Sequence, residues 1–170
     1  MFPEDINELA QDVLGRARAA GLILATAESC TGGLVAGALT AIAGSSDVLD
    51  RGFVTYSNAA KTEMLGVPEA LIAGHGAVSE PVARAMADGA LAACSAGMAV
   101  SVTGIAGPGG GAPGKPVGLV HFALAQRGRP TLHRQARLGD IGREPVRLAS
   151  VRAALQMLLD ALGDPGAYEI

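Results

Sequence analysis

The sequence predicts an α/β protein, a three-layer α/β/α sandwich around a mixed, mostly parallel five-stranded sheet. Short apolar runs alternate with amphipathic helical segments along the chain. The first three runs are separated by helical crossovers, which join parallel strands, whereas the last two are joined by a short turn and are expected to be antiparallel. With 170 residues, 49% of them hydrophobic and 17% charged, the chain suits a single domain over 1–170.

Helical periodicity and turn residues define the elements of the N-terminal half. Apolar residues recur at helical spacing in the first segment, which Gly21 closes. Ser57 or Asn58 is the expected N-cap of a later helix, which ends before Gly66 and Pro68. The predicted elements are a helix over 4–19, a strand over 22–26, a helix over 31–43, a strand over 52–56, a helix over 59–65 and a helical turn over 68–73.

In the C-terminal half, a serine cap and Pro81 in the first turn favour a helix beginning at Ser79. A strand that is apolar on both faces follows it, and a turn over 126–130 joins two later strands into a hairpin. The predicted elements are a helix over 79–95, a strand over 98–103, a loop over 104–116, strands over 117–125 and 131–137, and a helix over 144–162.

Composition excludes several classes of function. A net charge of −3, with few aromatic residues, argues against a nucleic-acid-binding protein. No apolar run approaches the ~20 residues that span a bilayer, so we expect no membrane association and a soluble, cytoplasmic protein. The two cysteines form no disulfide framework, and the three histidines lack metal-ligand spacing, so we expect no metal and no cofactor.

Three stretches with chemically useful side chains follow the first three parallel strands: 26-TAESCTGG-33, 55-TYSNAAK-61 and 103-TGIAGPGGG-111. In an open α/β sheet, ligands bind beyond the carboxyl ends of the strands. We therefore expect these stretches to meet at one edge of the sheet and to form a site.

The first stretch has two interpretations. Ser29 or Thr31 can simply cap the following helix. Alternatively, Ser29 is a nucleophile, and the N–H groups of Thr31, Gly32 and Gly33 hold an oxyanion or a phosphate. Cys30 is an alternative nucleophile, since a helix N-terminus lowers the pKa of a thiol.

The second stretch contains Lys61, which is expected in the first turn of its helix. The positive end of the helix dipole and partial burial both lower the pKa of an amine, toward a neutral form that can act as a base. Taken alone, a lysine is more often a solvated surface charge. Tyr56 and Asn58 supply a phenol and an amide that could orient a substrate.

The third stretch continues into a loop with six glycines over 104–116, which is either a flexible connection or a backbone that approaches a ligand closely. Thr103, Gly104 and Gly107 are the expected binding residues here. Arginines are also frequent over 127–152, either as a solvated surface or as anion-binding groups, and Arg143 is the candidate for substrate binding.

Together these stretches resemble one protein family. The residues 27-AESCTGGLVAGALT-40, 44-GSSDVLDRGFVTYSNAAKTEMLGVP-68, 74-GHGAVSEPVARAMADGA-90 and 103-TGIAGPGGGAPGKPVGLV-120 are similar, in this order, to the CinA C-terminal domain, the nicotinamide-nucleotide amidohydrolase family. The resemblance spans roughly 5–162 and is closest to the stand-alone form, which lacks a molybdopterin-binding-like domain. It implies an α/β/α sandwich and a dimer or higher oligomer.

The resemblance further implies hydrolysis of the carboxamide of nicotinamide mononucleotide to nicotinic acid mononucleotide and ammonia, a step of pyridine-nucleotide salvage. Ser29 matches the family's proposed nucleophile, Lys61 its proposed base and Tyr56 a neighbouring tyrosine. The stretch 139-GDIGREPVR-147 departs from a shorter Gly-Asp-Arg form, which leaves the role of Arg143 open. The alternative function is a nucleotide-binding regulatory module without catalysis, and an assay for ammonia distinguishes the two.

Overall fold

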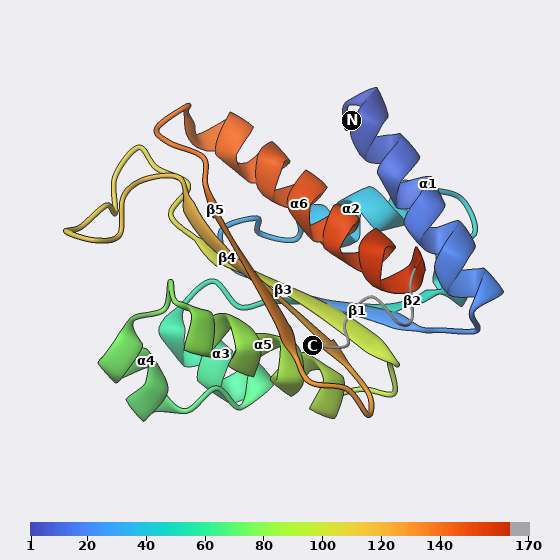
Figure 1. The fold of residues 1–170 in the computed structure, drawn as a ribbon, viewed down its shortest axis with the longest axis horizontal. Coiled ribbons are helices and arrows are strands. Elements are labelled where there is room, and N and C mark those ends of the chain that lie inside the picture. Colours follow the sequence, from blue (N-terminus) through green and yellow to red (C-terminus); the bar gives the residue numbers. More distant parts are fainter. Residues whose placement is uncertain (164–170) are drawn as a thin grey trace.

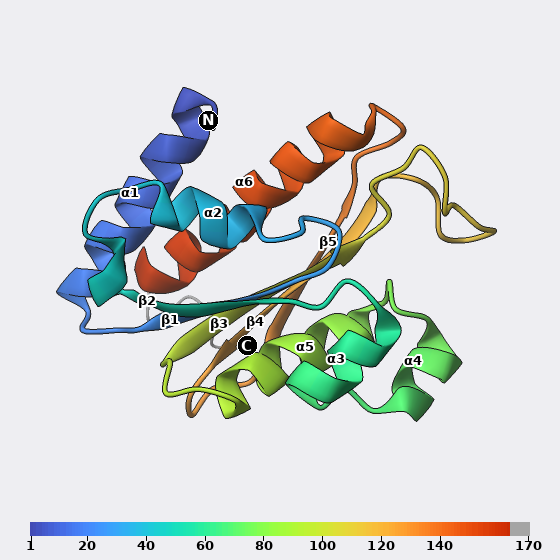
Figure 2. The ribbon, with the colours of Figure 1, turned by 180° about the vertical axis from the view of Figure 1, so that it is seen from behind.

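The computed structural model describes residues 1–163 and confirms the predicted fold class. The elements are α1 (Glu4–Ala19), β1 (Leu24–Glu28), α2 (Leu34–Thr40), η1 (Ser45–Asp47), β2 (Leu49–Val54), α3 (Asn58–Leu65), α4 (Glu69–His75), α5 (Glu80–Ala92), β3 (Met98–Gly104), β4 (Leu119–Gln126), β5 (Leu132–Arg137) and α6 (Arg143–Gly163). Helices α1, α2 and α6 cover one face of the sheet, and α3, α4 and α5 cover the other (Figures 1 and 2).

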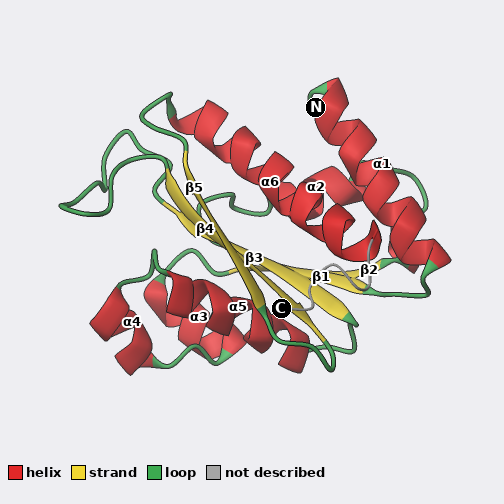
Figure 3. Ribbon diagram, viewed as in Figure 1, coloured by secondary structure: helices red, strands yellow, loops and turns green. Residues whose placement is uncertain are grey.

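The sheet has the strand order β2-β1-β3-β4-β5. β1 lies parallel to both β2 and β3, while β3, β4 and β5 are successively antiparallel, as the crossovers and the hairpin predicted. Because β1 and β3 are central and parallel, the segments that leave their carboxyl ends emerge side by side. Figure 3 shows these loops at the same end of the sheet, where the long connection from β3 to β4 projects outward.

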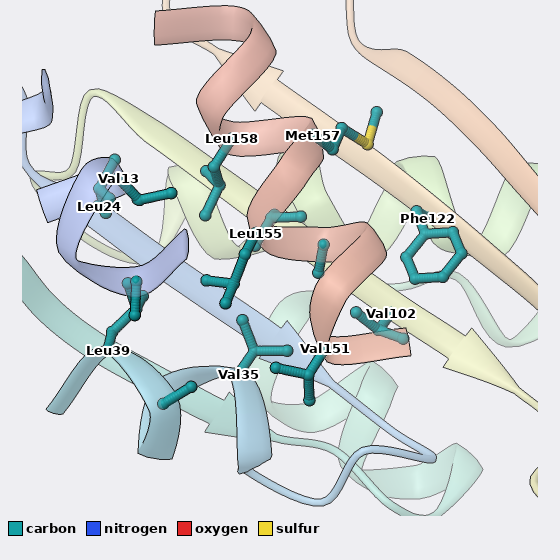
Figure 4. Close-up of a cluster of buried hydrophobic side chains, with 14 of the residues drawn as sticks. Val13, Leu24, Val35, Leu39, Val102, Phe122, Val151, Leu155, Met157 and Leu158 are labelled. Atoms are coloured by element: carbon teal, nitrogen blue, oxygen red, sulfur yellow. The ribbon is translucent and has the colours of Figure 1, made fainter. Parts of the chain in front are cut away.

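The larger apolar core fills the space between the sheet and the helices α1, α2 and α6 (Figure 4). Leu155 and Leu158 of α6 are fully buried beside Val35 of α2 and Leu24 of β1. Side chains of a strand alternate between its two faces, and so β1 directs Leu24 into this core while Ala25 and Ala27 belong to the core beneath α3 and α5. Both layers of helices are thereby fixed on β1, the strand that leads into the site.

Close approach of α3 to α5 depends on one glycine. A side chain at Gly89 of α5 would collide with the carbonyl oxygen of Leu65, at the end of α3. Glycine is tolerated inside this helix, despite its cost of roughly 1 kcal/mol relative to alanine, because no other residue permits the contact. The contact places α3, and with it Lys61, against the sheet.

Several predicted boundaries are wrong, and the most informative is the start of α2. The helix expected over 31–43 begins only at Leu34 and ends at Thr40. Gly32 and Gly33 have φ values of 61° and 94°, which are left-handed and cannot belong to a right-handed helix. The polar stretch before α2 is therefore a tight turn, hereafter the Ser29 turn (residues 29–33).

Smaller shifts affect the strands and the other helices. The first two strands were predicted over 22–26 and 52–56, whereas β1 begins at Leu24 and β2 begins at Leu49. These two first residues are paired in the sheet. The helical turn expected over 68–73 is the complete helix α4, and the helix expected over 79–95 ends at Ala92. Ser79 occupies the N-cap position of α5, but its hydroxyl donates to the carbonyl of Gly76 and caps no N–H group.

Candidate active site

The three polar stretches converge at the carboxyl ends of the parallel strands and line one cavity of about 280 Å³. Nine of the twelve predicted site residues contribute to its wall: Ser29, Cys30, Tyr56, Asn58, Lys61, Thr103, Gly104, Gly107 and Arg143. Thr31, Gly32 and Gly33 do not line it. The prediction from strand topology therefore located the cavity, while the second half of the Ser29 turn lies behind its wall.

Ser29 and Lys61 form the central contact of this cavity. The Nζ atom of Lys61 lies 3.0 Å from Oγ of Ser29 and 2.8 Å from the carbonyl oxygen of Thr55. Ser29 follows β1 directly, and its own N–H donates to the carbonyl of Val102 on β3. Lys61 lies in the first turn of α3, where the Ser57 hydroxyl accepts a hydrogen bond from the N–H of Ala60 and begins the helix.

Lys61 is a buried amino group. Its side chain is 1% exposed, and among residues 1–163 it forms no salt bridge. Burial penalises the charged ammonium and lowers the pKa of Lys61 from its ordinary value of 10.5. This is the direction expected from partial burial at this position, and the amine lies within reach of a hydroxyl proton.

Cys30 differs from Ser29 in its environment. Burial raises the pKa of the Cys30 thiol to about 11, and the carboxylate of Glu28 raises it further. The expectation that the helix N-terminus lowers this pKa is wrong, because desolvation dominates. Near neutral pH the side chain is thus a thiol, which is a weak nucleophile.

Glu28, which sequence reasoning did not single out, fills the N-terminus of α2. Its side chain is 1% exposed and accepts hydrogen bonds from the N–H groups of Gly33, Val35 and Ala36, at 3.0, 3.0 and 2.9 Å. The hydroxyl of Thr26 adds a further donor at 3.1 Å. The helix N-terminus is thus already occupied by an anion of the protein itself.

This arrangement corrects the predicted oxyanion donors. The N–H of Gly33 is bound to Glu28, and the N–H of Gly32 donates to the carbonyl of Ser29 at 3.0 Å. Within residues 1–163, the N–H groups of Cys30 and Thr31 are the ones in the turn that donate to no oxygen atom. Thr31 lies behind the cavity wall, so the available donor of the turn is the N–H of Cys30, which lines the cavity.

Arg143 links three segments at the mouth of the cavity. Its guanidinium donates to the hydroxyl of Tyr56 and to the carbonyl of Gly107, both at 2.8 Å. Tyr56 is 59% exposed and lies at the end of the β2–α3 connection. The arginine therefore carries a positive charge to the rim, next to the glycine-rich loop.

A fourth wall of the cavity consists of residues without reactive groups, and sequence reasoning therefore did not single it out. Ala77 and Val78, in the connection between α4 and α5, line the cavity together with Ser29 and Lys61. The Thr103 hydroxyl donates to the carbonyl of Ala77 at 2.9 Å, and Lys115 donates to the carbonyl of His75. These contacts tie the wall to β3 and to the glycine-rich loop, so the loop is partly held in place.

The described residues bring no three His, Cys, Asp or Glu side chains together in an arrangement that could hold a metal ion. His121 and His133, on β4 and β5 as expected, instead contact each other at 2.9 Å. No helix within residues 1–163 has the length and apolar character needed to cross a bilayer.

Comparison with known proteins identifies the family. The model of the CinA C-terminal domain matches residues 6–162. The chain belongs to the CinA C-terminal domain family. A CinA-like protein of Anaeromyxobacter dehalogenans (strain 2CP-C) is 51% identical over 95% of this chain. The chain spans only 39% of that relative's length, and 30% of a putative competence-damage inducible protein from Symbiobacterium thermophilum.

Other CinA relatives match over almost their whole length. The nicotinamide-nucleotide amidohydrolase PncC of Escherichia coli (strain K12) is 51% identical, over 93% of this chain and 95% of that protein. The crystal structure of the competence/damage inducible protein CihA from Agrobacterium tumefaciens has a TM-score of 0.93 and 57% identity, covering 96% of this chain and 99% of that chain. The competence damage-inducible protein A from Klebsiella pneumoniae has a TM-score of 0.88 at 38% identity.

Proposed function

We propose that the protein is an amidohydrolase that converts nicotinamide mononucleotide and water to nicotinic acid mononucleotide and ammonia, in pyridine-nucleotide salvage. The observation that carries the chemistry is the contact between Ser29 and a buried Lys61. The identity to the amidohydrolase of E. coli supports the substrate. A hydroxyl beside an amine of lowered pKa is the arrangement expected of an activated nucleophile.

The first half of the reaction forms an acyl-enzyme. Neutral Lys61 accepts the proton of the Ser29 hydroxyl, and the serine oxygen attacks the carboxamide carbon. The carbonyl oxygen becomes an oxyanion, which the free N–H group of Cys30 stabilises. Lys61 then returns the proton to the nitrogen, and the C–N bond breaks to release ammonia and leave an ester on Ser29.

The second half uses water. Lys61, neutral again, removes a proton from a water molecule that attacks the ester carbon. The ester bond breaks, the proton returns to the Ser29 oxygen through Lys61, and nicotinic acid mononucleotide leaves as the carboxylic acid, which gives up its proton to the released ammonia or to solvent. One amide bond is broken, one water is consumed and the enzyme is restored.

The phosphate of the nucleotide is assigned to the rim. Arg143 is the cationic side chain that lines the cavity besides Lys61, and Gly107, Gly109 and Gly110 supply backbone that a ligand can approach closely. Tyr56 and Asn58 line the same cavity, and we assign them to orienting the nicotinamide ring and the ribose.

Incubation of the purified protein with nicotinamide mononucleotide tests the proposal. Equimolar ammonia and nicotinic acid mononucleotide are expected, and Ser29→Ala protein should release neither. Folded wild-type protein that binds the nucleotide but gives no ammonia above the buffer control would contradict hydrolysis and support the regulatory-module alternative.

A further inference from the structure

We infer that Glu28 and Arg147 are positioning residues, which hold the Ser29 turn from opposite sides so that the N–H of Cys30 stays free for the oxyanion. The inference rests on the proposed hydrolysis and adds two residues to it. Neither side chain lines the cavity. Both are charged, and within residues 1–163 neither forms a salt bridge, so each uses its charge on the backbone of the turn.

Arg147 holds the carbonyl groups of the turn. It lies on α6, one helical turn after Arg143, and is half-buried. Its Nε donates to the carbonyl of Cys30 at 3.1 Å, and its Nη2 donates to that of Thr31 at 2.9 Å. A planar guanidinium is suited to such a pair of parallel hydrogen bonds, whereas a lysine ammonium is a single point charge.

Glu28 holds the amide groups. Its carboxylate accepts from Gly33 in the turn and from Val35 and Ala36 in the first turn of α2. β1 places it on the same face of the strand as Leu24, which is the face that α2 and α6 cover. The two charged residues therefore reach the turn from β1 and from α6, far apart in the sequence.

These contacts fix the orientation of each peptide group in the turn. In a trans peptide the C=O and the following N–H point in opposite directions. Because Arg147 binds the carbonyl of Cys30, the N–H of Thr31 faces away from the guanidinium. The N–H of Gly32 binds the carbonyl of Ser29, which likewise orients the N–H of Cys30.

Close packing makes the arrangement rigid. A side chain at Gly32 would lie 3.3 Å from Nη2 of Arg147, so the guanidinium sits directly against the backbone. Loss of Arg147 would release the carbonyl of Cys30 and let this residue move, and a Cys30 N–H that is misplaced by about 1 Å costs ~10²-fold in rate. Binding of the substrate at the rim should be little affected, since Arg147 is absent from the cavity wall.

The test compares Arg147→Lys and Arg147→Met with Arg152→Met, a matched control on the same helix whose arginine pairs with Asp5 on the surface. Turnover of nicotinamide mononucleotide is measured per mole of folded protein, determined by circular dichroism. We expect kcat to fall ~10²-fold in both Arg147 variants, with KM within about threefold of wild type, and the control to keep wild-type kinetics. Added methylguanidinium should restore part of the kcat of Arg147→Met.

Glu28→Gln supplies a second, independent measurement. It should lower kcat as well, and the variant that combines it with Arg147→Lys should be little worse than the poorer single variant, because both changes release the same turn. Arg147→Lys with a kcat close to that of the control would overturn the inference, and so would a raised KM at unchanged kcat or fully multiplicative losses. If Arg147→Met does not fold, the lysine variant decides. Wild-type protein without turnover would instead refute the proposed function.

Discussion

The amine of Lys61 lies 3.0 Å from the hydroxyl of Ser29, although 32 positions of the chain separate the two residues. The amine is buried, and within residues 1–163 no acidic side chain forms a salt bridge with it. A hydroxyl and a desolvated amine in contact are chemically matched, because the second can accept the proton that makes the first a nucleophile.

The first prediction concerns Lys61→Arg. A guanidinium keeps the positive charge but does not give up its proton in a protein, so it cannot act as a base. We expect kcat to fall by ~10² or more, close to the loss in Lys61→Met, as is typical for removal of a general base. Steady-state ammonia release by folded protein measures this, and substantial turnover by the arginine variant would leave Lys61 as an anchor only.

The pH dependence of stability gives a second prediction for the same residue. Because the pKa of Lys61 is lowered in the folded state, the unfolded chain binds more protons as pH approaches 10.5. The free energy of unfolding should therefore rise as pH increases, and this rise levels off near pH 10.5, where the unfolded lysine also loses its proton. Urea titrations should show a flatter pH profile for Lys61→Met than for wild type over the alkaline range. Parallel profiles would indicate an unperturbed lysine.

Exchange of the neighbouring residues distinguishes serine from thiol catalysis. The pKa of the Cys30 thiol is about 11, so little thiolate exists near neutral pH. Cys30→Ser should retain most of its activity, whereas Ser29→Ala should lose nearly all of it and still bind nucleotide by calorimetry. Cys94→Ser is the matched control for removal of a thiol. An inactive Cys30→Ser with an active Ser29→Ala would make this a thiol enzyme.

Arg143 should control affinity more than rate. It lies at the rim, bound to Tyr56 and to Gly107, rather than beside the reacting atoms. Arg143→Lys keeps the charge but loses the paired hydrogen bonds, and we expect KM to rise ~10-fold, the cost of a charge-assisted hydrogen bond. The ratio of kcat to KM for nicotinamide mononucleotide against the dephosphorylated nucleoside measures it. An equal loss on both substrates would argue against a phosphate contact.

The contact of His121 with His133 should make stability sensitive to mild acid. Burial lowers the pKa of both imidazoles, and the nearby cationic Lys115, Arg84 and Arg137 act in the same direction, while Glu80 opposes them. Below about pH 6.5 the unfolded chain therefore binds protons that the folded state does not, and the free energy of unfolding decreases as the pH decreases. His133→Gln should weaken this fall, with His75→Gln as the control for loss of an imidazole. An unchanged slope in His133→Gln would refute the assignment.

The sequence predicted the cavity because the rule behind it is topological. Ser29 and Lys61 each follow a parallel strand and Thr103 lies near the carboxyl end of β3, and parallel strands end at the same edge. Tyr56 and Asn58 were found by their position next to Lys61. The expected assembly into a dimer or higher oligomer stays a prediction.

What the sequence did not reveal depends on contacts without a local pattern. Glu28 caps a helix that begins six residues later, across two left-handed glycines, and no standard capping spacing covers that distance. Arg147 lies 117 positions from Cys30, and nothing in its own segment indicates a partner there. Ala77 and Val78 have apolar side chains that carry no chemical signal. The outline of a site can thus be inferred from strand order, while its supporting contacts require coordinates.

Arg147 of α6 binds the Ser29 turn, and this contact affects the stage of folding at which activity begins. Ser29 and Lys61 belong to the first 61 residues and are synthesised early, whereas Arg143 and Arg147 follow more than a hundred residues after Ser29. Contacts between such distant segments form late, because the intervening chain must first be ordered. A growing chain that has brought the serine and lysine together still lacks the arginines that hold the turn and the rim. Hydrolysis should therefore begin only after α6 has packed onto the sheet, and a nascent chain that lacks α6 should be inactive.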